Sequence, residues 1–209
     1  MSQELTKRIL SSIILIPITL FFIIKGSFLF ILFLLICLSV TFYEWHMMSK
    51  KKNYRILGFV FLFLSFYTIY KLRIDNDYLF ILLITLICVS TDIGGYVFGK
   101  MFKGPKLTKF SPNKTYAGMI GGYLLSVIST IFFNNFYFTK EIQINFFIFI
   151  ILISTTSQLG DIVVSYFKRL SKIKDTGKII PGHGGLLDRA DGMIFAFPFS
   201  YLILIIDIL

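Results

Sequence analysis

The sequence predicts an all-α membrane protein that crosses the bilayer about seven times. Of its 209 residues, 56% are hydrophobic and 18% are aromatic, whereas soluble domains are only about 45–50% apolar. The apolar residues form blocks of roughly 15–23 residues between short charged stretches, which matches about 20 residues per crossing of a ~30 Å hydrocarbon layer. No soluble domain, linker or internal repeat is evident, so residues 1–209 are predicted to form a single integral-membrane domain with its motifs at about 90–192.

The expected spans are seven apolar runs: Ile9–Ile24, Phe28–Tyr43, Ile56–Tyr70, Tyr78–Phe98, Tyr116–Phe138, Ile144–Val164 and Met193–Leu209. Lys7 and Arg8 precede the first run, but no small-residue cleavage site follows it, which favours an uncleaved helix over a removable signal. A run of about 16 residues covers only about 24 Å. Flanking side chains such as Lys25 and Arg55 are therefore expected to snorkel, or the bilayer to thin locally.

The Lys and Arg residues are unequally distributed between the two predicted faces. If the N-terminus is cytoplasmic, 17 of the 21 lie on that side, together with the two longest loops, Gly99–Thr115 and Ser165–Gly192. This bias predicts that the N-terminus is cytoplasmic and the C-terminus is outside. The net charge of +10 is dispersed among the spans, which argues against nucleic acid as a partner. Cys37 and Cys88 lie inside apolar runs and indicate neither a disulfide framework nor a metal site.

A polar insertion interrupts the sixth run. On a helix, Gln158, Asp161, Ser165, Lys168 and Lys172 would share one face. Carboxylates inside a membrane are costly and by default mark a functional site. The alternative is that Asp161 only pairs with a neighbouring lysine near the membrane surface.

A glycine-rich stretch follows this run. Gly182, Gly184 and Gly185 allow backbone N–H groups to approach a phosphate closely, and the loop leads into a span whose N-terminal amides favour anions. His183, between glycines, is expected to shape the loop, contact phosphate or transfer a proton. The same stretch carries charged side chains at Lys168, Arg169, Lys174 and Asp175.

Two carboxylates end the glycine-rich stretch. Asp188 and Asp191 are three residues apart, so on a helix both would face the same way and could hold Mg²⁺. The alternative is that one of them caps the last span. Arg189 between them suits a bidentate phosphate contact, or serves as a plain positive-inside anchor.

A third polar cluster lies at the other long loop. Asp92 falls inside the fourth run, so its charge needs a partner or a cation. Lys114 immediately precedes the fifth run, where its point charge could meet a polyphosphate. Glycines that follow it, Gly118 and Gly121 among them, are expected to permit close helix packing.

These motifs resemble the phosphatidate cytidylyltransferases, also called CDP-diacylglycerol synthases. The resemblance is carried by a long match in the last third of the chain: Ser165-x-x-Lys168-Arg169, Lys174-Asp175-x-Gly177 and Pro181-Gly-His-Gly-Gly-x-x-Asp188-Arg-x-Asp191. It extends to Gln-x-Gly-Asp161, to Ser111-Pro-x-Lys114-Thr115, and more faintly to Lys7-Arg8 and Glu44-Trp45. The chain departs from the family pattern at Ile93, usually Thr, and at Ala117, usually Glu, and it is shorter than many members between Trp45 and Asp92.

The resemblance implies an enzyme of the bacterial inner membrane, with its site on the cytoplasmic face. It would convert CTP and phosphatidic acid to CDP-diacylglycerol and pyrophosphate with Mg²⁺; a second cation, monovalent or not, is left open. We assign Mg²⁺ to Asp161 and Asp188, with Asp191 as a further ligand or as a group that supports a ligand. Catalytic roles are assigned to these three aspartates and to Lys168. Phosphate and substrate contacts are assigned to Lys168, Arg169, Lys114, Arg189, His183, the Gly182–Gly185 turn, Ser165, Lys174, Asp175 and Asp92, and Asp92 would complete the cation site or the cytidine pocket.

Two other functions are compatible with polar residues in membrane spans. A transporter would carry inward polar groups near mid-bilayer on several helices, whereas here they gather toward the predicted cytoplasmic ends. A CTP-dependent lipid-alcohol kinase would release CDP instead of pyrophosphate. A homodimer is compatible with the sequence, which does not fix the oligomeric state.

Overall fold

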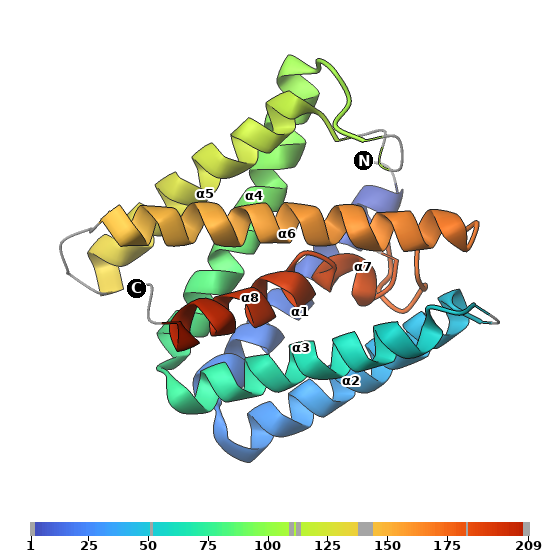
Figure 1. Ribbon diagram of the computed structural model, residues 1–209, viewed down its shortest axis with the longest axis horizontal. Helices are drawn as coiled ribbons and strands as arrows, with labels where there is room; N and C mark the ends of the chain where they lie inside the picture. Colours follow the sequence, from blue (N-terminus) through green and yellow to red (C-terminus); the bar gives the residue numbers. More distant parts are fainter. Residues whose placement is uncertain are drawn as a thin grey trace. The chain divides into compact units, whose positions relative to one another are not determined.

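Helices account for the regular structure of this protein, as predicted. The computed structural model describes residues 3–50, 52–108, 111, 114–137, 144–182 and 184–206. The helices are α1 (Gln3–Lys25), α2 (Ser27–Met48), α3 (Arg55–Asp75), α4 (Tyr78–Phe102), α5 (Tyr116–Tyr137), α6 (Ile144–Leu170), α7 (Leu187–Ala190) and α8 (Met193–Ile205) (Figure 1). Among these residues, the only β-type pairings are two isolated bridges, Lys106 with Thr115 and Ile180 with Gly184. The prediction of an all-α polytopic membrane protein is confirmed.

Each predicted span falls on one helix, although two of the helices are short of a full crossing. Among the described residues, α2 to α6 are long and apolar enough to span a membrane, whereas the apolar parts of α1 and α8 are Leu10–Lys25 and Met193–Ile205. The 13 residues of α8 cover about 20 Å at about 1.5 Å per residue. The last three residues of its predicted span, and Phe138 of the fifth, lie outside the described residues.

The sixth helix continues beyond its predicted end at Val164. Because no proline or glycine interrupts the chain there, α6 runs on to Leu170 and carries Lys168 and Arg169 in its last turn. Lys172 has a positive φ of 58°, which ends the helix, so the prediction that it shares the helical face of Asp161 is wrong. The predicted loop Ser165–Gly192 is correspondingly shorter, and α7 interrupts it.

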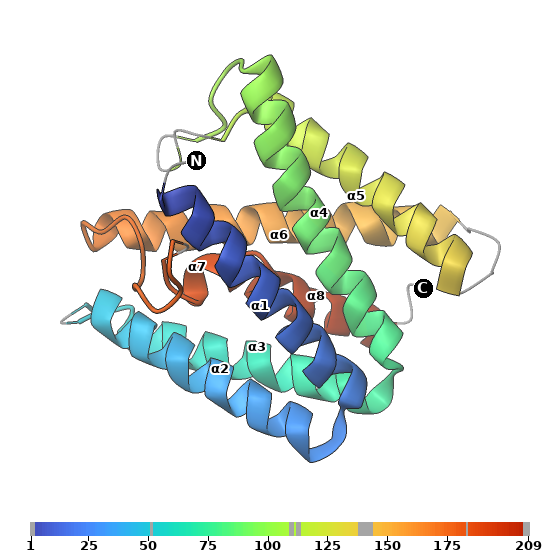
Figure 2. The ribbon, with the colours of Figure 1, turned by 180° about the vertical axis from the view of Figure 1, so that it is seen from behind.

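The chain forms two compact units. The first comprises Met1–Tyr78 and Lys168–Ala190, and the second Leu79–Phe167 and Asp191–Leu209. In the first unit, α2 and α3 run side by side in both views (Figures 1 and 2). The ring of Trp45 lies where a side chain on Gly58 would be, and its Nε1 donates to the Arg55 carbonyl at 3.0 Å.

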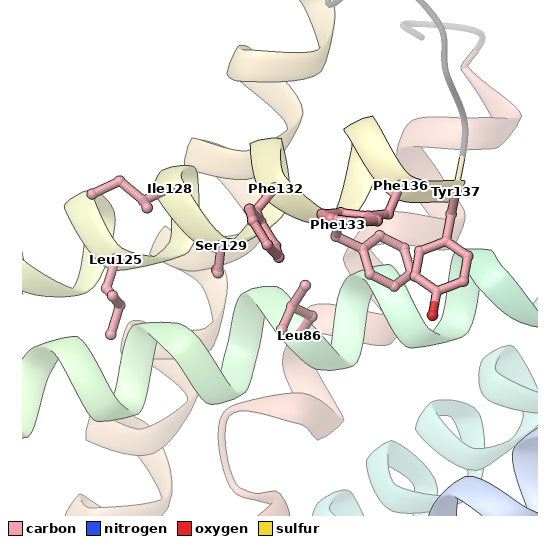
Figure 3. Close-up of a pocket in the computed structure, with 8 residues that line it drawn as sticks. All are labelled: Leu86, Leu125, Ile128, Ser129, Phe132, Phe133, Phe136 and Tyr137. Atoms are coloured by element: carbon pink, nitrogen blue, oxygen red, sulfur yellow. The ribbon is translucent and has the colours of Figure 1, made fainter.

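In the second unit, glycines bring α4 and α5 into backbone contact. A Cβ added to Gly94 would collide with the Gly121 carbonyl, and one on Gly118 would lie 2.6 Å from the Gly95 carbonyl. The prediction that these glycines permit close helix packing is confirmed. Further along the same two helices, Leu86 faces a row of α5 side chains, including Phe132 and Phe136, around an apolar cavity of about 550 Å³ (Figure 3).

Candidate functional site

Asp188, on α7, accepts hydrogen bonds from the loop that precedes this helix. Its Oδ2 accepts hydrogen bonds from the backbone N–H groups of Thr176, at 2.8 Å, and Gly185, at 2.9 Å. Its Oδ1 accepts from the Lys168 Nζ at 3.0 Å. The side chains of Lys168 and Asp188 are only 10% and 4% exposed. A buried ion pair therefore joins Lys168, at the end of α6, to the Asp188 carboxylate, which also binds two amides of the loop. This pair is the first charged centre.

Glu44 holds the same loop from α2. Its Oε1 accepts from the Leu186 N–H at 2.9 Å, and its Oε2 accepts from the Leu187 N–H at 2.7 Å and the Thr176 hydroxyl at 3.2 Å. The residue is 1% exposed. The sequence prediction did not include Glu44 or Thr176 in the site. The available signal was a carboxylate immediately after the predicted span Phe28–Tyr43, with no basic residue one turn away.

Gly184 and Gly185 leave the space that the Asp188 and Glu44 carboxylates occupy. Gly184 has φ 87°, and a Cβ on it would lie 2.8 Å from the Asp188 Oδ2. A Cβ on Gly185 would lie 2.6 Å from both carboxylate oxygens of Glu44. Because amides of this turn and of the start of α7 donate to protein carboxylates, the anion that they bind in this structure is intramolecular. Phosphate binding by Gly182, Gly184 and Gly185 stays a prediction, and His183 lies outside the described residues.

The basic side chains of this loop are on its surface. Arg169, Lys172, Lys174, Lys178 and Arg189 are exposed, as is Asp175. The guanidinium of Arg169 also donates to the Ile173 carbonyl at 3.1 Å, which fixes the chain as it leaves α6. The loop thus keeps most of its carboxylates inside and its cations outside, an arrangement that attracts polyanions.

A second charged centre lies in the other unit, where Asp161 forms an ion pair with Lys114. The Ser165 hydroxyl donates to the Asp161 Oδ1 at 3.3 Å, which places both on the predicted helical face. The pair is about a quarter exposed, 24% for Lys114 and 25% for Asp161. The pairing of Asp161 with a lysine, weighed above as the alternative, is therefore present, and its partner is itself a predicted phosphate ligand.

The loop before α5 presents Lys114 to this centre. The Leu107 N–H donates to the Lys114 carbonyl at 2.7 Å, and the Tyr116 N–H donates to the Pro105 carbonyl at 3.2 Å. The Lys114 Nζ also reaches the Gln158 carbonyl at 3.5 Å. These bonds close a short hairpin-like turn that holds the lysine against α6.

The remaining predicted carboxylates have different surroundings. Asp92 is exposed on α4. Asp191 is 7% exposed and lies in the turn after α7, where its Oδ1 accepts the Gly192 N–H at 3.0 Å. The premise that Asp188 and Asp191 lie on one helix is wrong, because α7 ends at Ala190. The shared cation site of Asp161, Asp188 and Asp191 combines residues of both units and stays a prediction.

The apolar cavity of Figure 3 is not suited to phosphate chemistry. Its lining is aliphatic and aromatic apart from Ser129 and the Tyr137 hydroxyl. The Ser129 hydroxyl already donates to Ser90 at 2.8 Å.

Comparison with known proteins gives one consistent result. A family model described as the cytidylyltransferase family matches residues 6–76 and 58–207. The phosphatidate cytidylyltransferase of Rickettsia bellii is 35% identical over 96% of this chain and 91% of its own length. The protein of the same name from Rickettsia typhi is 34% identical over 94% of this chain and 90% of its length. That of Staphylococcus haemolyticus is 34% identical over 82% of this chain and 68% of its length.

Proposed function

We propose that this chain, which belongs to the cytidylyltransferase family, condenses CTP with phosphatidic acid to CDP-diacylglycerol and pyrophosphate. The observation that carries the proposal is the near full-length match to proteins named phosphatidate cytidylyltransferase. The two charged centres supply the chemistry that such a reaction needs. Both are built from residues that the sequence motifs singled out.

The reaction is a phosphoryl-centre substitution. A phosphate oxygen of phosphatidic acid attacks the α-phosphorus of CTP, a new phosphoanhydride bond forms, and the bond from the α-phosphorus to the bridging oxygen of the β-phosphate breaks. Pyrophosphate leaves with that electron pair. Since the attacking phosphate is already anionic near neutral pH, the protein must mainly position the reactants and neutralise charge.

We assign that work to cations of both centres. Lys168 and Lys114 are held by Asp188 and Asp161, so their ammonium groups are fixed in place before substrate arrives. Exposed Arg169 and Arg189 offer planar guanidinium groups that suit bidentate phosphate contacts.

Mg²⁺ is part of this proposal. Among the described residues, no group of three or more His, Cys, Asp or Glu could hold a metal ion, and Mg²⁺ in nucleotide enzymes is held by one or two carboxylates plus substrate phosphates. Asp161 fits this role because it is a quarter exposed and, among the described residues, its partners are the side chains of Lys114 and Ser165. Asp188 would have to exchange Lys168 for the ion. When bound, the ion would neutralise developing charge on the phosphates.

We place the protein in the inner membrane of a bacterium, with the N-terminus and both long loops in the cytoplasm. The Lys and Arg distribution supports this orientation. CTP would arrive from the cytoplasm, while phosphatidic acid would keep its acyl chains in the bilayer and its phosphate at headgroup level. Labelling of single introduced cysteines by a membrane-impermeant reagent tests the orientation; labelling of residue 174 only from outside the cell would overturn it.

The deciding experiment follows the label of CTP into lipid. Purified protein is given phosphatidic acid, Mg²⁺ and CTP radiolabelled at either the α- or the γ-phosphate. We expect the α-label in lipid and the γ-label in pyrophosphate. Label from the γ-phosphate in a lipid, with diacylglycerol or another lipid alcohol as acceptor, would instead establish a kinase. Solute flux in vesicles without CTP consumption would establish a transporter.

A matched pair of variants separates the site from its surroundings. Asp188→Asn should abolish CTP-dependent product formation without preventing membrane insertion. Asp75→Asn removes a carboxylate of the same unit that is 42% exposed and, in the described part of the chain, pairs with Lys71 at 3.6 Å. Turnover of this variant should match that of the wild type. Equal turnover in both variants would exclude Asp188 from the site.

A further inference from the structure

Glu44 occupies a position where a carboxylate is costly. It lies on the apolar helix α2 and is 1% exposed, and a buried charge is unfavourable unless hydrogen bonds satisfy it. Three donors do so: the backbone N–H groups of Leu186 and Leu187 and the Thr176 hydroxyl. All three lie between Thr176 and Leu187, the segment that leads into Asp188 on α7. Among the described residues, the hydrogen bonds that the carboxylate accepts therefore all come from this one segment.

The loop is built closely around this carboxylate. A Cβ on Gly177 would lie 2.8 Å from the Glu44 Oε1, and one on Gly185 would lie 2.6 Å from it. Thr176 links the two buried acids, because its hydroxyl donates to Glu44 while its N–H donates to Asp188. A change in Glu44 therefore reaches the Lys168–Asp188 pair directly through Thr176.

We infer that Glu44 is a positioning residue that holds the loop from Thr176 to Leu187 in the conformation that binds CTP. The inference rests on the function proposed above. Glu44 has no task in the chemical step, because its oxygens are buried against backbone donors. Glu44 instead sets the fraction of molecules in which Lys168, Asp188 and the surrounding cations already have the CTP-binding arrangement before CTP binds.

A neutral isostere shows why the charge matters. Glu44→Gln has one oxygen and one NH₂ group, so in either orientation a backbone N–H of Leu186 or Leu187 faces another donor. Loss of one hydrogen bond to a charged group corresponds to a roughly ten- to hundredfold change in an equilibrium constant. The loop conformation that Glu44 stabilises then becomes a minor state. Because CTP binds only this state, the apparent affinity for CTP is reduced in proportion to its population.

The expected kinetic signature is therefore an increase in KM with a preserved kcat. In Glu44→Gln we expect the KM for CTP to rise about tenfold or more, while kcat at saturating CTP stays within about twofold, because bound CTP restores the loop. Glu44→Asp keeps both acceptor oxygens on a shorter side chain, so its KM for CTP should lie between those of the wild type and Glu44→Gln. A role confined to overall stability would instead lower the active fraction at unchanged KM.

A second measurement reads the hydrogen bonds without any turnover. Amide hydrogen exchange of the purified protein should accelerate at Leu186 and Leu187 in Glu44→Gln, and addition of CTP should slow it again. Thr41→Val is the matched control on α2, because the bonds of the Thr41 hydroxyl to described residues stay within its own helix, to the Cys37 and Leu38 carbonyls, both at 3.0 Å. It should leave both the exchange and the KM unchanged.

The outcomes separate this inference from the proposed function. If wild-type protein incorporates CTP into lipid but Glu44→Gln has wild-type KM and wild-type exchange, the inference fails and the function stands. If the wild type shows no CTP incorporation, the function fails. Faster exchange at Leu186 and Leu187 with no effect of CTP would support the hydrogen bonds from these amides to Glu44. It would overturn the link between these bonds and nucleotide binding.

Discussion

The buried pair of Lys168 and Asp188 allows stability and activity to be separated by a double-mutant cycle. Asp188→Asn preserves the shape of the side chain but leaves the Lys168 ammonium, which is 10% exposed, without its counter-charge. Breaking a buried pair by removing one partner typically costs about 3–5 kcal/mol. At about 2–4 °C per kcal/mol for a chain of this size, the midpoint of thermal unfolding should fall by about 6–20 °C.

The second single variant should be milder, and the double variant should recover. In Lys168→Met the Asp188 carboxylate keeps two backbone donors, Thr176 and Gly185, so part of its charge remains compensated. In the double variant neither charge is buried, and the loss should be smaller than the sum of the two singles by about 1–3 kcal/mol. Activity should not recover, because the cation proposed to hold phosphate is still missing.

The chain offers its own reporter for this measurement. Cys88 is 0% exposed on α4 and Cys37 is half-buried, so in a Cys37→Ala background a thiol-reactive fluorescent dye in detergent reads the exposure of Cys88 on unfolding. The exposed pair of Lys71 and Asp75 provides the control, since its side chains are 33% and 42% exposed and such pairs contribute about 0–1 kcal/mol. An unchanged midpoint in Asp188→Asn would refute the buried-pair argument, and so would additive losses in the double variant.

Three further predictions concern the second unit. Gly94→Ala should destabilise by about 1–3 kcal/mol, because its Cβ would collide with the Gly121 carbonyl, whereas Gly95→Ala should be nearly neutral, because its nearest contact is at 3.7 Å; equal dye-unfolding midpoints would contradict this. Lys114→Met should cost at most about 1 kcal/mol, since the pair is a quarter exposed, yet lower CTP incorporation by tenfold or more. Asp161→Asn should likewise spare the midpoint but raise the Mg²⁺ concentration needed for half-maximal turnover, and an unchanged Mg²⁺ requirement would remove Asp161 from the cation site.

The fold was predictable because in a membrane chain hydrophobicity acts almost alone. Backbone polar groups must be satisfied within each span, so an apolar run of about 20 residues has helix as its only solution. Helix ends were harder. The chain from Ser165 to Leu170 is polar enough to resemble a loop, yet it lacks a breaker, and the helix continues until the positive φ of Lys172.

Residue type and position in the sequence named the candidate site residues, whose roles stay predictions, but did not show the direction of their side chains. Conspicuous acids such as Asp188 and Asp161 were recognised, and the structure gives both a lysine partner. The sequence could not show that Glu44 lies beside Thr176, because their contact joins positions 132 residues apart. Nor does a Gly-rich motif reveal whether its amides face a substrate phosphate or a carboxylate of the protein, since both are anions with similar geometric demands.

In the first unit, carboxylates of the protein satisfy the loop amides while cations stay on the surface. A loop that must attract a triphosphate carries many cations, and a flexible cationic loop would lose conformational entropy on binding. Glu44 and Asp188 reduce that cost by satisfying the loop's own amides beforehand, and because they are buried they add little negative potential at the surface. The exposed cations, Lys174 and Lys178 among them, then determine the sign of the field that CTP meets, with Asp175 as the exposed exception. Internal carboxylates thus hold the loop rigid and leave its surface attractive to anions.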